Sequence, residues 1–348
     1  MKILLIGLGA IGQRHGRNLR TLLGDDAQFL AWRTQRSVPA LAADMSVRPN
    51  VDLEIEYSIQ AFDDLDEALA QQPQIAVIAN PTSLHIPTAL RCARTGCDLF
   101  LEKPLSHSLD GVNELIEIVT QKKLVAIVGY PLRAHPACRL VKQLLDENAI
   151  GTLLHARIAF GESLPDWHPY EDYRRSYAAR RELGGGVVLT QIHDLDLALW
   201  FFGMPQRVLA FGGQWSDLEI DVEDAVSALF EYSISTPQGE RVFPLHLQQD
   251  YVQKPPRREF EIVGSRGMIR LDFPKLRVEQ TSFSDGQTRV HEFAGFERNT
   301  LFLEQMRDFL DCVRDRKTPD ISVEEGARSL QIALATRRSL ESRSVEVI

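Results

Sequence analysis

The first part of the chain alternates short apolar runs with segments of helical periodicity, up to about residue 128. The apolar runs predict strands at 2–6, 28–32, 74–79, 98–101 and 125–128. Apolar positions spaced by three or four residues predict helices between them, near 10–22, 63–71, 85–95 and 107–122. Strands that alternate with helices form a parallel sheet with both faces covered, so such strands are apolar almost throughout. The pattern therefore predicts an α/β fold, a doubly wound parallel sheet of the Rossmann type.

The pattern changes after Gly129. Helices are predicted near 135–148, 187–202, 299–315 and 322–342, and longer strands at 152–161, 206–215, 223–235, 241–251, 258–264 and 267–273. Alternation of polar and apolar residues at 258–263 and a turn at Gly264-Ser-Arg-Gly267 indicate antiparallel hairpins. We therefore expect a Rossmann domain at 1–128 and an α+β domain at 129–348 with a large, mostly antiparallel open sheet. One face of that sheet is left for water or a partner.

Composition excludes several functional classes. The 348 residues are 44% hydrophobic and 25% charged with a net charge of −9, and no basic stripe carries interleaved aromatic residues, so nucleic-acid binding is not expected. No apolar run reaches the roughly 20 residues that span a bilayer, and the first apolar stretch leads into arginines rather than a cleavage site. We expect a cytoplasmic protein without membrane association, its four cysteines reduced and buried.

A glycine-rich turn connects the first predicted strand to the first predicted helix. Its residues are Gly7, Gly9, Ala10, Ile11 and Gly12 in the pattern GxGxxG. In this context the first glycine permits a tight turn, the second lets a pyrophosphate approach, and the third lets helix and strand pack closely. The helix N-terminus adds free N–H groups and a positive dipole end. The turn predicts a dinucleotide site.

The end of the second strand bears on the choice of dinucleotide. NAD-binding domains usually place an acidic residue here, which binds the ribose hydroxyls. This chain has Arg33-Thr34-Gln-Arg36 instead. Arg33 and Arg36 can bind a 2′-phosphate, with Thr34 between them, so the sequence favours NADP over NAD; two solvated arginines are the alternative.

Three further motifs identify a family when they are taken in order along the chain. Asn80-Pro81-Thr-Ser-Leu-His85 follows the predicted strand at 74–79, and Glu102-Lys103-Pro104 follows the next strand. Gly184-Gly-Gly186 then leads into a helix that contains His193. Together with the glycine turn, this set resembles the Gfo/Idh/MocA family of glucose–fructose oxidoreductase and myo-inositol dehydrogenase. The resemblance implies a substrate domain built on an open sheet, and homodimers or homotetramers formed through that sheet.

The resemblance makes Lys103 the lysine that holds the reacting hydroxyl beside the nicotinamide. Glu102 and Pro104 shape its turn, where a cis Lys103–Pro104 bond is plausible. The carboxyl ends of parallel strands are where such folds bind ligands, and a lysine there can stabilise alkoxide character. Asn80, Pro81 and His85 lie on a loop expected to face the nicotinamide ribose. A capping or packing role is the alternative for Asn80 and His85.

The predicted helix at 187–202 supplies the acid/base group. Thr190, His193 and Asp196 are spaced by three and share a face, and the imidazole of His193 exchanges the hydroxyl proton near neutral pH. Many family members carry an aspartate one turn before this histidine, whereas this chain has Leu189 and Thr190. Either Asp194 or Asp196 orients the imidazole, or the chain belongs to a subgroup in which the His/Asp arrangement varies. Gln191 and Asp194 are also candidates for contacts to substrate.

The remaining substrate candidates lie in two segments. Tyr130 and Arg133 match a family segment that lines the substrate site, with core packing as the alternative. The loop 166–177 offers flat aromatic faces and polar groups for a sugar or cyclitol, among them Trp167, His168, Tyr173 and Arg174. A loop packed on its own domain is the alternative there. No metal-ligand spacing is present, so no metal is expected.

These features predict an NAD(P)-dependent oxidoreductase that transfers a hydride between the nicotinamide and a ring alcohol or ketone of a sugar, a sugar derivative or a cyclitol. Lys103 positions and polarises the hydroxyl, and His193 is the acid/base. A non-catalytic, dinucleotide-sensing regulator on the same fold is the alternative, because a fold alone does not determine function.

Overall fold

The structure is a computed structural model that describes residues 1–34, 38–236 and 239–348, so Arg36 lies outside the described residues. Contacts divide the chain into two units. The first contains Met1–Tyr130 and Arg298–Ala327, and the second contains Pro131–Glu297 and Arg328–Ile348. Helix α9 (Arg298–Asp315) therefore belongs to the first unit, although the boundary drawn from the sequence assigns it to the second. Its Met306 and Phe309 are fully buried in the core of the first unit, a contact that no local pattern reveals.

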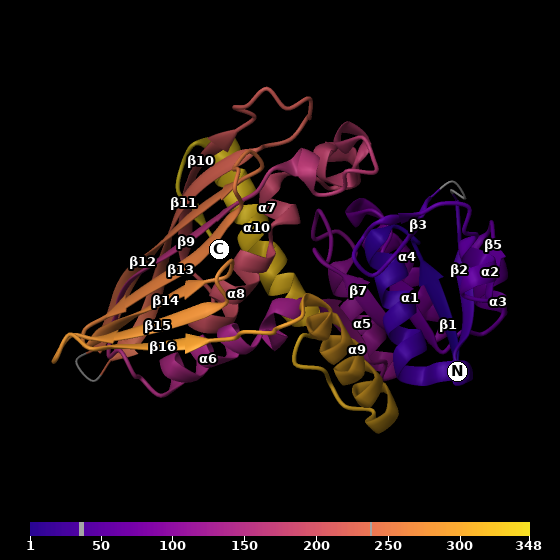
Figure 1. Ribbon diagram of the computed structural model, residues 1–348, viewed down its shortest axis with the longest axis horizontal. Helices are drawn as coiled ribbons and strands as arrows, with labels where there is room; N and C mark the ends of the chain where they lie inside the picture. The colour runs from indigo at the N-terminus through magenta and orange to yellow at the C-terminus, as the bar shows by residue number, and fades with distance from the viewer. Residues whose placement is uncertain (35–37, 237–238) are drawn as a thin grey trace. The chain divides into compact units, whose positions relative to one another are not determined.

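Within the described part of the first unit, six parallel strands form a sheet in the order β5-β2-β1-β6-β7-β8 (Figure 1). This is the strand order of a Rossmann fold, so the predicted fold class is confirmed. The strands are β1 (Lys2–Ile6), β2 (Gln28–Trp32), β5 (Ile59–Phe62), β6 (Ile75–Ile78), β7 (Asp98–Glu102) and β8 (Ala126–Gly129). The helices are α1 (Ala10–Leu23), α2 (Leu53–Glu56), α3 (Leu65–Ala70), α4 (His85–Thr95) and α5 (Val112–Lys122). A short hairpin joins β3 (Ala40–Leu41) to β4 (Val47–Arg48).

The second unit is built on a larger sheet, in which the described residues form nine strands. Their order is β16-β15-β14-β13-β9-β12-β11-β10-β17; β9 and β12 are parallel and the other pairs are antiparallel. The strands are β9 (Leu153–Gly161), β10 (Arg207–Gly213), β11 (Ala225–Thr236), β12 (Gly239–Asp250), β13 (Arg257–Gly264), β14 (Gly267–Asp272), β15 (Arg277–Ser282), β16 (Thr288–Glu292) and β17 (Glu346–Val347). The sequence pattern missed β3, β4, β5, β15, β16 and β17, which are short or too polar to stand out.

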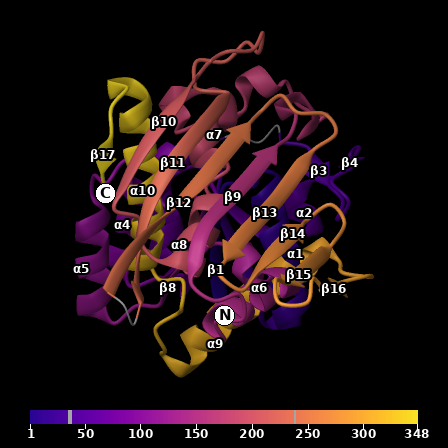
Figure 2. The ribbon, with the colours of Figure 1, turned by 90° about the vertical axis from the view of Figure 1, so that its left-hand side faces the viewer.

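Helices lie along one face of the larger sheet, and the other face is open (Figures 1 and 2). The helices of this unit are α6 (Pro136–Asp146), α7 (Val187–Thr190) and α8 (His193–Phe202); α10 (Val323–Ser342) crosses the boundary between the units. Phe260 and Ile262 of β13 point to the covered face and are buried, whereas Glu259 and Glu261 point to the open one. This alternation is what the sequence pattern predicts for a half-covered strand.

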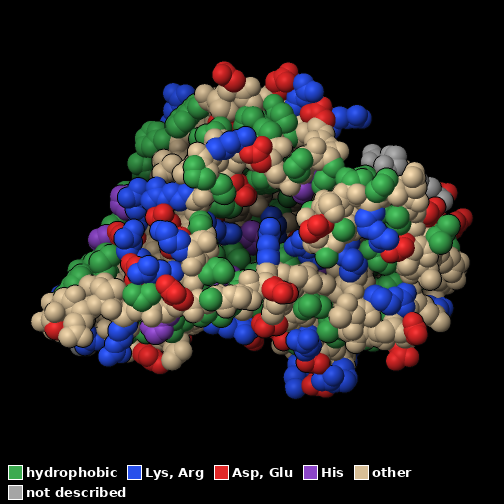
Figure 3. Space-filling view, viewed as in Figure 1, with side chains coloured by type: hydrophobic (Ala, Val, Ile, Leu, Met, Phe, Trp, Pro, Cys, Tyr) green, Lys and Arg blue, Asp and Glu red, His purple; other side chains and the backbone are tan. Residues whose placement is uncertain are grey.

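The open face carries ion pairs on one side, and on the other side exposed apolar residues lie among polar ones such as Glu231 and His246. Strands β13 to β15 carry cross-strand charges such as Arg270 with Glu261, and Figure 3 shows basic and acidic side chains side by side over this region. Strands β10 to β12 present Phe211, Leu229 and Val242, which are 56%, 42% and 62% exposed. Among the described residues, no helix is both long and apolar enough to cross a membrane.

Candidate active site

The glycine turn at the carboxyl end of β1 leaves space where a nucleotide phosphate fits. Gly7 has a φ of +88°, and a Cβ there would lie 2.5 Å from the carbonyl oxygen of Ala79. A Cβ on Gly12 would lie 1.9 Å from the carbonyl oxygen of Gly7, so both positions exclude a side chain. At Gly9, by contrast, a Cβ would meet nothing within 4 Å. The turn is thus closed toward the protein and open where a ligand would lie.

Helix α1 begins directly at this opening. Ala10 and Ile11 form its first turn, and the first intrahelical bond runs from the Gln13 amide to the Gly9 carbonyl at 2.9 Å. The amides before it point out of the helix end with the positive end of its dipole, an arrangement that binds phosphate. These residues fit a dinucleotide, as the motif predicts.

Arg33 lies in a different setting from the one that the sequence suggests. Its side chain is buried, and Nη1 donates a hydrogen bond to Oε1 of Glu54 on α2 at 2.9 Å. A guanidinium held in this way is not presented to solvent for a 2′-phosphate. Thr34 is exposed.

His85 and Asn80 lie at the carboxyl ends of the strands, but His85 is buried rather than facing a ligand. Its Nδ1 lies 2.8 Å from the carbonyl oxygen of Pro104, and its Nε2 lies 2.8 Å from that of Asn80. Burial lowers the pKa of His85, although both carbonyls act in the opposite direction. The ring therefore ties the loop that starts with Asn80 and Pro81 to the turn at Lys103–Pro104, and packing is the role that its contacts support.

Lys103 follows β7, two strands away from the glycine turn and at the same edge of the sheet. The Lys103–Pro104 bond is cis. Lys103 is half-buried, and its backbone amide donates to Oε2 of Glu102 at 3.2 Å. Oε1 of Glu102 in turn lies 2.6 Å from Nε2 of His15, a residue of α1. A buried contact thus connects the helix of the phosphate site to the lysine turn.

In the second unit, the helix predicted at 187–202 is broken in two. Helix α7 ends at Thr190 and α8 begins at His193, so Thr190, His193 and Asp196 do not share the face of one helix. The carbonyl of Gln191 accepts a hydrogen bond from Nε2 of Gln249 on β12 at 2.8 Å. The side chain of Gln191 donates to the Asp250 carbonyl at 3.0 Å. These contacts with β12 stabilise the break and leave His193 as the first residue of α8.

The two aspartates after His193 each bind an arginine. Oδ1 of Asp194 accepts two hydrogen bonds from Arg258 of β13, at 3.0 and 2.7 Å. Asp196 binds Arg133 through both oxygens, at 3.0 and 2.6 Å, and also accepts from Ser329. Both aspartates are buried, so these pairs attach the first turn of α8 to its surroundings.

Several predicted substrate contacts therefore lie in the packing around His193. Gln191 and Asp194 are 1% and 0% exposed, and Arg133 holds Asp196 with its guanidinium near Trp200. Tyr130, which follows β8 in the first unit, is 1% exposed. The contacts of these four side chains are thus with the protein itself, and their contacts with a substrate stay a prediction.

The loop 166–177 is held by contacts within itself and with Glu219 and Tyr251. Arg174 binds Asp172 at 2.8 Å and Glu219 at 2.9 Å, and Nδ1 of His168 lies 2.7 Å from Glu171. The hydroxyl of Tyr173 accepts from the Glu219 amide, and the ring of Trp167 packs edge-on against Tyr251 with centroids 5.4 Å apart. Trp167, His168 and Tyr173 keep part of their surface exposed. The aromatic residues can still meet a sugar, whereas Arg174 is already bound to two acids.

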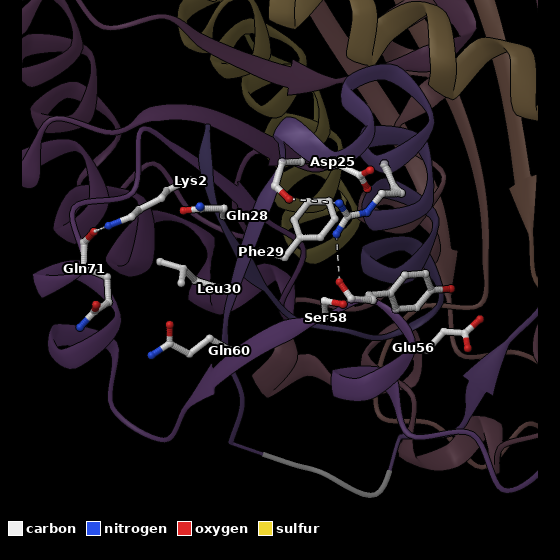
Figure 4. A pocket seen from close by; sticks show the side chains of 12 residues that line it. Lys2, Asp25, Gln28, Phe29, Leu30, Glu56, Ser58, Gln60 and Gln71 are labelled. Carbon is white, nitrogen blue, oxygen red and sulfur yellow. Dashed lines mark hydrogen bonds between the residues drawn. The ribbon is translucent and has the colours of Figure 1, made fainter.

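A cavity of about 650 Å³ lies elsewhere in the first unit (Figure 4). It is lined by Lys2, Gln28, Gln60 and Gln71 among others, at the amino ends of β1, β2 and β5. Ligands of open α/β sheets bind at the carboxyl ends, so this cavity is not part of the active site. Among the described residues, no group of three or more His, Cys, Asp or Glu side chains could hold a metal ion.

Sequence reasoning missed His15, Glu54 and Arg258. Arg258 had a usable signal, because it occupies an inward position of an alternating strand, in register with Phe260 and Ile262. A charge at such a position needs a buried partner. His15 lies one turn after Gly12 on the buried face of α1, which is a weaker form of the same signal.

Comparison with known proteins agrees with this architecture. Residues 1–130 match the oxidoreductase family with an NAD-binding Rossmann fold, and residues 138–270 match the GFO/IDH/MocA C-terminal domain. Myo-inositol 2-dehydrogenase of Thermotoga maritima is 28% identical over 363 residues, covering 100% of this chain and 98% of the relative. Inositol 2-dehydrogenase of Rhizobium meliloti is 24% identical over 353 residues, covering 99% and 98%.

Among solved structures, levoglucosan dehydrogenase in complex with NADH has a TM-score of 0.82 to this chain at 18% identity, covering 100% of this chain and 99% of that one. At this identity the similarity concerns the fold. The family matches cover both the nucleotide-binding sheet and the larger sheet, and the relatives extend over the whole length. The chain belongs to the Gfo/Idh/MocA family of oxidoreductases.

Proposed function

We propose that this protein is a nicotinamide-dependent dehydrogenase acting on a ring alcohol of a sugar, a sugar derivative or a cyclitol. The observation that carries the proposal is the arrangement at one edge of the Rossmann sheet. The open glycine turn after β1 and Lys103 after β7 lie at the same edge. The relatives named for inositol and levoglucosan dehydrogenases support the substrate class.

Each proposed catalytic group has one task. The ammonium of Lys103 holds the reacting hydroxyl and stabilises negative charge on its oxygen. The imidazole of His193 accepts the hydroxyl proton during oxidation and returns it during reduction. The bound nicotinamide supplies the hydride acceptor or donor. Trp167 and Tyr173 are proposed to pack against the ring of the substrate.

Substitution of the two groups tests this function. We expect His193→Asn and Lys103→Met each to lower kcat by about 10²- to 10⁴-fold, with little change in NADH affinity measured by fluorescence titration. His291→Asn on the edge strand β16 is the control and should leave both unchanged. The substrate panel contains myo-inositol, scyllo-inositol, levoglucosan and glucose. Tight NADH binding without oxidation of any sugar or cyclitol would favour the dinucleotide-sensing alternative.

The choice between NAD and NADP depends on fewer residues than the sequence suggests. Arg33 is bound to Glu54, so a preference for NADP has to come from Thr34 and from Arg36, outside the described residues. We keep NADP as the sequence-based prediction and test it by comparing the Kd of NADPH and NADH in the wild type and in Arg36→Gln. A loss of affinity confined to NADPH supports it; equal affinities in both proteins contradict it.

We also propose that copies of the chain associate through the open face of the larger sheet. Phe211, Leu229 and Val242 are large apolar side chains exposed on three adjacent strands of this face. Light scattering should show a dimer or tetramer, and Leu229→Glu should shift it toward the monomer. A monomeric wild type would refute this assembly. A cytoplasmic location remains the expectation from the sequence.

A further inference from the structure

A buried histidine lies behind the lysine turn. His15 of α1 is completely buried, and its ring packs against Phe100 and Phe302 with centroids 4.7 and 6.3 Å away. Its Nε2 lies 2.6 Å from Oε1 of Glu102, which is 87 residues away in the sequence. The contact joins the helix that starts at the glycine turn to the last residue of β7.

The carboxylate of Glu102 is held on several sides. While Oε1 meets His15, Oε2 accepts the backbone amide of Lys103 at 3.2 Å. Gly129, at the end of the neighbouring strand β8, leaves the room that this carboxylate needs, since a Cβ there would come within 3.2 Å of Oε1. The group is thus fixed in place directly before the lysine.

Glu102 is charged in this position. Burial by itself raises the pKa of the carboxyl, but the hydrogen bond with His15 and the electrostatic effects of His15 and Lys103 outweigh it, so the pKa is lowered. Burial lowers the pKa of Arg14 on α1 to about 10, and the negative charge of Glu102 acts in the opposite direction. Because this carboxylate is ionised and held in place, it favours the charged form of the neighbouring Lys103 ammonium and fixes the direction in which the ammonium points.

We propose that His15 is a positioning residue, which holds Glu102 and through it keeps Lys103 in the orientation that the reaction needs. The inference rests on the proposed function of Lys103. Because His15 belongs to the helix that begins at the phosphate site, a shift of α1 moves the carboxylate that supports the lysine. A displacement of about 1 Å is enough to lower turnover by about 10²-fold.

Three variants separate positioning from packing. His15→Phe fills the volume and removes the donor, His15→Gln keeps an N–H donor, and Glu102→Gln keeps the shape of the acceptor without its charge. We expect kcat to fall by about 10²-fold in His15→Phe and to recover to within about threefold of the wild type in His15→Gln. Thermal unfolding followed by circular dichroism verifies that each variant is folded.

The double variant is the decisive measurement. If His15 acts through Glu102, adding His15→Phe to Glu102→Gln lowers kcat no further. If His15→Phe costs the same factor in both backgrounds, His15 acts through packing and the proposal is wrong. A parallel loss of NADH affinity in His15→Phe would also overturn it, because the effect would then lie in the phosphate site.

An assay that does not depend on catalytic turnover tests this inference separately from the proposed function. Competitive acetylation at pH 7, quantified by mass spectrometry, reports the reactivity of the Lys103 amine against exposed Lys123 as an internal reference. We expect at least a threefold increase for Lys103 in His15→Phe and none in His15→Gln. Unchanged labelling in His15→Phe refutes the positioning role. Absence of dehydrogenase activity in the wild type refutes the proposed function alone.

Discussion

The ion pair between Asp194 and Arg258 should contribute strongly to stability, and its removal tests how α8 is held. The side chain of Asp194 is 0% exposed and that of Arg258 is 15% exposed. The guanidinium also packs on two aromatic rings, 4.4 Å from the centroid of Phe160 and 5.0 Å from that of Phe273. These contacts hold the guanidinium in place, so it cannot reorient toward solvent when Asp194 is replaced.

Asp194→Asn keeps the shape and removes the charge. Breaking a buried pair costs about 3–5 kcal/mol, and the partial exposure of Arg258 places this one near the lower end, about 3 kcal/mol. The free energy of unfolding of a protein is typically about 5–15 kcal/mol, so a loss of this size leaves the variant folded. Urea unfolding followed by circular dichroism measures the loss. Because His193 precedes Asp194, kcat should fall as well.

A double-mutant cycle and a surface pair complete the experiment. Asp194→Asn combined with Arg258→Met should cost about 2 kcal/mol less than the sum of the single variants, because neither buried charge is then left alone. The control Glu261→Gln breaks a partly exposed pair, in which Glu261 and Arg270 are 3.7 Å apart. The free energy of unfolding should change there by less than about 0.5 kcal/mol. A loss under about 1 kcal/mol in Asp194→Asn, or strict additivity, would refute the reasoning.

Three further predictions concern the glycine turn and pH. Gly9→Ala should fold normally but raise the Kd of NADH at least about tenfold in a fluorescence titration, because its methyl group enters the open space; unchanged affinity contradicts the assigned phosphate site. Gly12→Ala should instead unfold or lose about 3 kcal/mol or more in urea, since its Cβ meets the Gly7 carbonyl. Burial lowers the pKa of His135 from 6.5 to about 4, so the unfolded chain binds one more proton between these values. Stability should therefore fall by about 3 kcal/mol as the pH drops through this window. His135→Asn keeps the acceptor for the Ala137 amide and should lack this component; an identical pH dependence in both proteins would disprove it.

The Rossmann unit was predictable because its signals are local. Buried parallel strands are apolar throughout, helices repeat every three or four residues, and β1 and β2 have the bounds that the pattern predicts. The glycine turn was equally predictable from the sequence. At Gly7 and Gly12 a side chain would collide with the backbone of the same strand–helix unit or of the neighbouring strand, so both positions need glycine. The motif order from Gly7 to His193 also determined the family.

Tertiary contacts decided what surrounds the candidate groups. At the break between α7 and α8, Gln249 of β12 donates a hydrogen bond to the Gln191 carbonyl, and the partners of Asp194 and Asp196 are arginines far away in the chain. Periodicity within the segment 187–202 carries no information about these partners, so a single helix was the natural prediction. The sequence likewise predicted that Arg33 binds a phosphate, whereas in the folded chain Arg33 forms an ion pair with Glu54.

The amino-acid sequence alone therefore determined the fold class, the dinucleotide turn and the family. All three follow from residues that are near one another along the chain or from motifs in a fixed order. Only the tertiary structure decided that His85 supports a turn, that His15 lies behind Glu102, and that α9 packs in the first unit. The physical reason is that burial and ion pairing depend on which distant segments meet, and this is a property of the folded chain rather than of any local pattern.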